Sequence, residues 1–201
     1  RWNPLEKPFE MYQDMLSLND KVRVNEEEGY YVFEDKIYYN QDELKSIIQS
    51  KKQELFDEVY EDLNDICSVL CPIKNKSEPI WESGAKNFIL AITLAMLEDS
   101  ENPELGMTKE KFNFYNLVKI ATYRDTDGDN MMKTLQQYTS GRDMLSKVPA
   151  LTSTVVNNAP NTTRSYLGVL QPKIAVFQDM GICYCTSGTD VSFDDFTDMP
   201  T

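Results

Sequence analysis

The sequence contains no histidine, so it lacks the side chain that most often serves as a general base or a metal ligand near neutral pH. Neither a Gly-x-Ser-x-Gly nucleophile motif nor a zinc-protease motif occurs. The 33 Asp and Glu residues are spread along the chain, so no acid/base pair stands out among them. We therefore predict a protein that is not an enzyme and has no cofactor; a hydrolase or metal enzyme that uses a carboxylate cluster is the alternative.

Basic residues are also few. The chain has 20 Lys and Arg against 33 Asp and Glu, which gives a formal net charge of -13 and a pI near 4.4. Such a field repels a phosphate backbone and attracts basic proteins. The charge balance disfavours direct nucleic-acid binding and favours a basic protein partner.

Long apolar runs are absent as well. No stretch reaches the roughly 18 uninterrupted apolar residues typical of a membrane span, and the opening Arg1-Trp2-Asn3-Pro4 has no features of a secretion signal. We expect a soluble chain that makes no membrane contact. Because it begins without an initiator Met, we also expect a fragment of a longer protein.

Only four cysteines are present, in the pairs Cys67-x-x-x-Cys71 and Cys183-x-Cys185. The first pair would share one face of a helix and the second one face of a strand, so a four-thiolate zinc site is geometrically conceivable. Neither spacing is the usual Cys-x-x-Cys, and reduced, buried thiols are the simpler interpretation.

Apolar residues recur three or four positions apart through most of the chain, which is the pattern of amphipathic helices. The segment 79–99 is apolar nearly all round in its middle and is the best candidate for a central helix. The predicted fold class is all-α, a multi-helix bundle forming one domain over residues 1–201. The expected helices are 5–18, 40–71, 79–99, one that Thr108 caps and that continues to about 120, 131–138, 144–148, 150–157 and 160–179.

A different pattern occupies residues 21–40. Aromatic and β-branched residues flank the polar turn Glu34-Asp35-Lys36, which predicts a β-hairpin appendage near residues 30–39. Its tyrosines offer rigid, amphipathic surface of the kind found in interface hot spots, although half of them could instead pack on the helices. An acidic tail, 187–201, has two phenylalanines that could form a docking strip. The predicted partner-binding residues are Tyr30, Tyr31, Tyr38, Tyr39, Phe193 and Phe196.

Two short motifs suggest a calcium loop and a phosphate-binding loop, but each has a simpler interpretation. The segment 125–130 has alternating carboxylates, but its glycine is at the fourth rather than the sixth position of a calcium loop, and Gln136 stands where the closing Glu would be, so helix capping explains it better. Gly84-Ala85-Lys86 lacks the glycine-rich approach of a phosphate-binding loop. The segment 182–185 could be a strand.

Two stretches together resemble one family. They are Arg1-Trp2-Asn3-Pro4-Leu5 and the sequence from Pro79 to Ala91, Pro-Ile-Trp-Glu-Ser-Gly-Ala-Lys-Asn-Phe-Ile-Leu-Ala. These resemble the coupling proteins of conjugative type IV secretion, the TraG/TraD-like hexameric ATPases. The resemblance covers most of the chain and includes Asn161-Thr162-Thr163-Arg164-Ser165-Tyr166. The residues that carry the family motif are Trp2, Asn3, Pro4, Trp81, Glu82, Gly84, Ala85 and Phe88.

The resemblance implies the all-α insertion domain of such a protein, without its ATPase motor and membrane helices. It implies a substrate receptor that docks relaxase, relaxosome accessory proteins or other secreted proteins. The parent would be a hexamer anchored at the cytoplasmic side of a bacterial cell membrane. The tyrosine-rich hairpin departs from a purely helical insertion.

Two alternatives remain within the same motor: a domain that contacts single-stranded DNA, and a structural spacer without partner affinity. The first needs Lys and Arg gathered on one face amid aromatics. We expect the isolated domain to be a monomer, because contacts between subunits in this family come largely from the motor. We also expect the family-motif residues around Trp81 to be structural, with Trp81→Ala costing about 3–5 kcal/mol of stability through a buried cavity.

Overall fold

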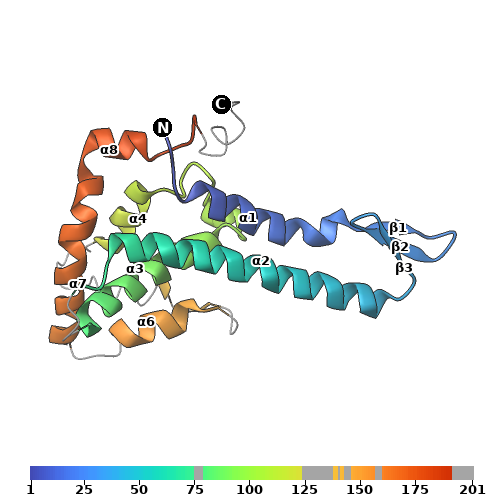
Figure 1. Cartoon of the computed structure of the whole chain (residues 1–201), viewed down its shortest axis with the longest axis horizontal. Coiled ribbons are helices and arrows are strands. Elements are labelled where there is room, and N and C mark those ends of the chain that lie inside the picture. Colours follow the sequence, from blue (N-terminus) through green and yellow to red (C-terminus); the bar gives the residue numbers. More distant parts are fainter. Residues whose placement is uncertain (75–78, 124–137, 140, 143–145, 157–159, 192–201) are drawn as a thin grey trace, which may run out of the picture. The chain divides into compact units, whose positions relative to one another are not determined.

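The computed structural model describes residues 1–74, 79–123, 138–139, 141–142, 146–156 and 160–191, without the side chains of 154–156 and 160–164. It is 66% helix, with seven α-helices and one three-stranded antiparallel sheet among these residues (Figure 1). The prediction of a mainly helical chain is confirmed. The contacts divide the chain into two compact units, which we call unit 1, Arg1–Glu6 with Leu63–Thr201, and unit 2, Lys7–Asp62.

Two helices and a sheet form unit 2, which is described throughout. Helix α1 (Glu6–Leu16) buries Phe9, Tyr12 and Met15, and a 3-10 turn, η1 (Ser17–Lys21), follows it. Helix α2 (Gln41–Leu70) runs beside α1 in this unit, and the rings of Tyr12 and Phe56 lie 6.5 Å apart (Figure 1). These bounds agree with the predicted helices 5–18 and 40–71.

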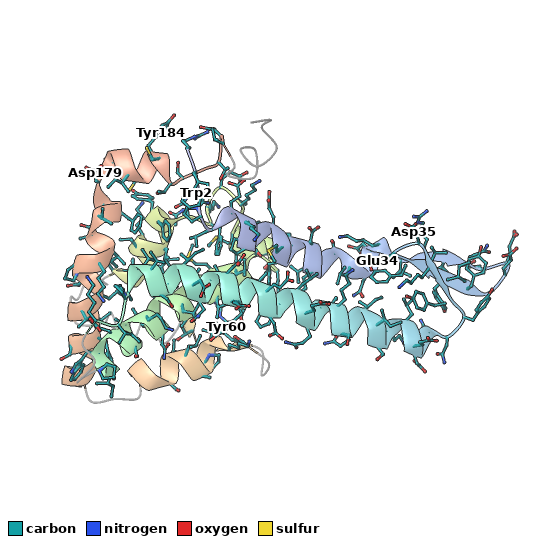
Figure 2. The ribbon with its side chains drawn as sticks, in the orientation of Figure 1. Trp2, Glu34, Asp35, Tyr60, Asp179 and Tyr184 are labelled. Atoms are coloured by element: carbon teal, nitrogen blue, oxygen red, sulfur yellow. The ribbon has the colours of Figure 1, made fainter. Side chains whose placement is uncertain are left out.

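The sheet of unit 2 has the order β1-β2-β3. It consists of β1 (Arg23–Asn25), β2 (Tyr30–Phe33) and β3 (Lys36–Tyr38), so a third strand joins the predicted hairpin. Glu34 and Asp35 form the β2–β3 turn with φ angles of 49° and 61°, as a two-residue type I′ turn requires (Figure 2). Unit 2, residues 7–62, covers more of the chain than the insert predicted at 21–40.

Helix α3 (Ile80–Asp99) forms the centre of unit 1. All residues from Phe88 to Leu97 are buried, as its apolar sequence predicted. It packs against α4 (Phe114–Ala121), α6 (Val148–Val156) and α7 (Pro160–Ile174).

Helix α4 begins later than predicted. A short 3-10 turn, η2 (Pro103–Leu105), precedes it, and Asn113 rather than Thr108 provides its N-cap, since Asn113 Oδ1 accepts the Asn116 amide at 3.1 Å. Asn113 has an extended backbone and a side-chain oxygen that accepts an amide of the first turn, which are the two requirements of an N-cap.

The C-terminal part of unit 1 also differs from the prediction. After α7 comes the 3-10 turn η3 (Ala175–Gln178) and then α8 (Met180–Cys185), so the predicted strand at 182–185 is wrong. The Asp179 carboxylate accepts the amides of Gly181 and Ile182 at 2.9 and 3.1 Å, and this N-cap starts a helix despite the β-prone side chains. Helix α6 begins at Val148, within the segment predicted as two short helices.

Several predicted features lie outside the described residues: the segment 125–130, nearly all of the helix at 131–138, the start of the helix at 144–148, and residues 192–201 of the acidic tail. None of the described helices combines the length and the apolarity that a membrane span requires.

Candidate partner-binding surface

The two faces of the unit 2 sheet have different roles. Tyr31 and Tyr38 are directly opposite across β2 and β3 and lie on the inner face, together with Phe33. Both pack on a small core whose buried members are Leu18, Phe33, Leu44 and Ile48. These two of the four predicted tyrosines therefore hold the sheet to η1 and α2.

The outer face carries the other two tyrosines. Tyr30 and Tyr39 form an edge-to-face pair with ring centroids 6.1 Å apart. Tyr39 is 75% exposed and Ile37, on the same face, is 54% exposed. The cross-strand neighbour of Ile37 is the partly buried Val32. We define the outer sheet face as Tyr30, Val32, Ile37 and Tyr39; Arg23 and Asn25 of β1 lie on the same side of the sheet. It is the only part of the sheet where apolar side chains face solvent as a group.

Both turns at the ends of this face contain carboxylates. The turns of the sheet contain five of them, all exposed: Glu26, Glu27, Glu28, Glu34 and Asp35. Figure 2 labels Glu34 and Asp35 at the turn, where Glu34 pairs with Lys51. Unit 2 as a whole has 15 Asp and Glu against 7 Lys and Arg, a formal charge of -8 out of -13 for the chain. Unit 2 is thus much more acidic for its size than unit 1.

The remaining predicted partner-binding residues, Phe193 and Phe196, lie outside the described residues. Just before them, the Asp190 carboxylate receives hydrogen bonds from Arg1 Nε and Nη2, both at 2.9 Å. The Arg1 guanidinium is the main reason that the pKa of Asp190 is lowered to about 2. The described start of the acidic tail is therefore held against the first residues.

The structure shows the surroundings of the first three residues of the proposed motif. The Asn3 side chain is buried, with Nδ2 donating to the Phe112 carbonyl at 2.8 Å and Oδ1 accepting from the Leu5 amide at 3.2 Å. Pro4 follows at the start of α1 and is partly buried. Trp2 is 47% exposed, and its amide donates to the Cys185 carbonyl at 2.8 Å.

Gly84, Ala85 and Phe88 are buried in α3, as expected of structural residues. A Cβ at Gly84 would lie 2.3 Å from Tyr166 Cε1, so glycine permits the contact between α3 and α7. Glu82 is partly buried, and its carboxylate accepts the Lys74 amide at 2.5 Å.

Trp81 is less buried than predicted. It is only partly covered, and its ring contacts Tyr166 at 5.5 Å between centroids. Truncation would remove an aromatic contact without opening a closed cavity. We therefore replace the cost expected from the sequence with about 1–3 kcal/mol for Trp81→Ala.

The four cysteines are free thiols. Cys67 and Cys71 are buried on one helical face, and burial raises the pKa of Cys67 to about 12, away from the reactive range. Cys183 and Cys185 lie in α8 rather than on a strand, so they do not share a face. Within the described residues, no three His, Cys, Asp or Glu side chains gather as a metal site would require.

A polar cluster at the end of α3 could not be predicted from the sequence. The guanidinium of Arg142 lies 2.7 Å from Asp99 and 3.5 Å from Glu98, and Ser146 Oγ donates to Glu98 at 2.5 Å. Burial raises the pKa of Glu98, although Ser146 and Arg142 act in the opposite direction. No sequence pattern pairs residues 44 positions apart, so this cluster required the fold.

One open hollow in unit 1 has no chemistry that suggests catalysis. None of its lining side chains titrates near neutral pH. They are Thr122, Gly168, Gln171, Pro172, Ala175 and Gln178.

Comparison with protein-family models, curated proteins and solved structures found no match for the chain. The outer sheet face with its acidic turns is the surface that best fits a binding role.

Proposed function

We propose that this chain is a partner-docking domain that recruits basic proteins through unit 2. The observation that carries the proposal is the coincidence of two features: most of the net charge lies in unit 2, and its sheet presents exposed aromatic and aliphatic side chains. Acidic surroundings steer a basic partner, and a tyrosine-rich apolar patch contributes most of the contact energy after encounter.

The finer proposal is that the domain is the all-α insertion of a conjugative coupling protein at the cytoplasmic side of a bacterial membrane. It would dock relaxase or relaxosome accessory proteins. Its support is the resemblance of the two sequence stretches and the mainly helical fold.

Calorimetry on the whole chain tests the proposal, with the relaxase and accessory proteins encoded beside the parent gene as ligands and single-stranded DNA in parallel. We expect binding to a basic protein that weakens as salt rises, because exposed charges are screened beyond about 10 Å at 0.1 M salt. We expect no comparable binding to DNA. If none of these proteins binds, the proposal is contradicted and a structural spacer is favoured. Tight binding to DNA would contradict the charge argument.

A further inference from the structure

The backbone of β3 has hydrogen-bonding groups that the sheet does not use. In a two-residue hairpin the residues next to the turn, Phe33 and Lys36, form a hydrogen-bonded pair, and the pairs then alternate. The next pair, Val32 and Ile37, is therefore a non-hydrogen-bonded pair. The N–H and C=O of Ile37 accordingly point away from β2, toward the open side of the sheet.

The same alternation applies to β1. Val32 directs its backbone groups toward Arg23, so Val24 is the β1 residue whose N–H and C=O point outward. The sheet has two edge strands, β1 and β3, and each has one residue, Val24 or Ile37, whose backbone N–H and C=O point away from the sheet. Ile37 and Val24 are similarly exposed, at 54% and 58%.

The side chains distinguish these two edges. On the outer face, β3 presents Ile37 and Tyr39, whereas β1 presents Arg23 and Asn25. A strand added beside β3 would place alternate apolar side chains next to Ile37 and Tyr39, and one added beside β1 would meet a positive charge. Exposed carboxylates adjoin β3 on both sides, with Asp35 before it and Asp42 and Glu43 after it.

We propose that the docking partner contributes an extended segment, alternately basic and apolar, which adds to the sheet as a fourth strand along β3. This inference rests on the docking function proposed above and specifies its partner. The backbone of Ile37 would supply one donor and one acceptor, and the outer sheet face would select apolar side chains at alternate positions. The negative charge of unit 2 would select basic residues at the others.

The test uses the whole chain and a short, acetylated and amidated peptide of alternating lysine and valine, with affinity measured by calorimetry. The matched variants are Ile37→Pro and Val24→Pro, because each removes one outward N–H from an edge strand, where proline is tolerated. We expect Ile37→Pro to weaken peptide binding by about tenfold or more and Val24→Pro by less than about twofold.

A second comparison leaves the protein unchanged. Two peptides are compared, one with N-methyl groups on the odd residues and one with them on the even residues. Only one of the two lacks the N–H groups that would pair with β3. We expect that peptide to lose binding and the other to keep it, whether or not Ile37→Pro perturbs the fold. A helix-forming peptide of equal charge serves as the control and should bind more weakly than the extended peptide.

Strand addition would be overturned by equal effects of the two proline variants or by binding that does not change on N-methylation of the peptide. It would also be overturned by tighter binding of the helical peptide, or by no peptide binding at all. If the full partner proteins still bind in that case, the docking function stands and only its mode is wrong. If they do not bind either, both proposals fail.

Discussion

At position 84, the lack of a side chain allows two helices of unit 1 to meet. The Tyr166 ring occupies the space that a Cβ would need, with three of its atoms within 2.8 Å of that position. Gly168, two residues further along α7, has no atom within 4 Å of its own ideal Cβ. Gly84 therefore lies in a crowded helix contact, whereas Gly168 is exposed and has open space around it.

We predict that Gly84→Ala lowers the free energy of unfolding by about 1–3 kcal/mol, because Tyr166 or α7 must shift to accommodate the methyl group. Gly168→Ala is the matched control and should be neutral or stabilising by up to about 1 kcal/mol, since alanine favours a helix. Urea unfolding measures both. A neutral Gly84→Ala would mean that the α3–α7 contact is looser than the structure has it.

The Glu98 carboxyl, beside Arg142, Asp99 and Ser146, has a pKa raised above its ordinary value of 4.5, chiefly by burial. A carboxyl with a raised folded-state pKa holds its proton more tightly when folded, so its contribution favours folding at low pH and is lost as pH rises through the raised pKa.

We therefore predict that the free energy of unfolding of the wild type, minus that of Glu98→Gln, decreases as pH rises above 4.5. Chemical unfolding at a series of pH values gives this difference, with exposed Glu104→Gln as the control. A difference that increases with pH would show that Arg142 outweighs burial.

At the scale of elements, the sheet of unit 2 has one face that packs on a core and one that carries exposed side chains. Successive side chains of a strand point in opposite directions, so neighbours such as Tyr30 and Tyr31 have different surroundings. Tyr31 packs on the core formed with η1 and α2, while Tyr30 meets Tyr39 on the outer side.

We predict that Tyr31→Ala destabilises the protein by about 1–3 kcal/mol, since it removes packing from a small core. Tyr39→Ala should change stability by less than about 1 kcal/mol, because the ring is exposed and loses only its contact with Tyr30. Tyr39→Ala should weaken partner binding, in contrast. Thermal unfolding and calorimetry on both variants separate the effects, and equal destabilisation would refute the division of the faces.

Much of this element order could be predicted from the sequence. Helical spacing predicted α1, α2 and α3 to within a residue or two, because a long amphipathic or apolar pattern leaves few alternatives. Short elements were harder. Three-residue β1 has too little pattern to detect, and α8 depends on the Asp179 cap, which outweighs the strand preference of Ile182 and Tyr184.

The candidate site could be predicted only in part. The sequence identified the four tyrosines of the sheet but not which of them face the core, because their orientation depends on the strand register. Nor could it find the Glu98–Arg142 contact, which brings together distant parts of the chain. The concentration of charge in unit 2 was present in the sequence, but its significance depended on knowing that residues 7–62 form one compact unit.

At the scale of the whole molecule, the proposed docking of a basic partner depends on the concentration of negative charge in unit 2. Unit 2 holds 15 of the 33 carboxylates and only 7 of the 20 basic residues. A field of this kind increases the rate of encounter with a basic partner and weakens as salt rises. Removing charge near the outer sheet face should therefore matter more than removing equal charge from unit 1.

The most direct measurement compares two triple variants in their affinity for the basic partner protein at low and physiological salt. One is Glu26→Gln, Glu27→Gln and Glu28→Gln in the β1–β2 turn; the other is Glu101→Gln, Glu104→Gln and Glu110→Gln in unit 1. All six carboxylates are exposed. We predict that the first variant binds about three to ten times more weakly at low salt and that the second changes by less than about twofold. Equal losses in the two variants, or none in the first, would contradict docking through unit 2.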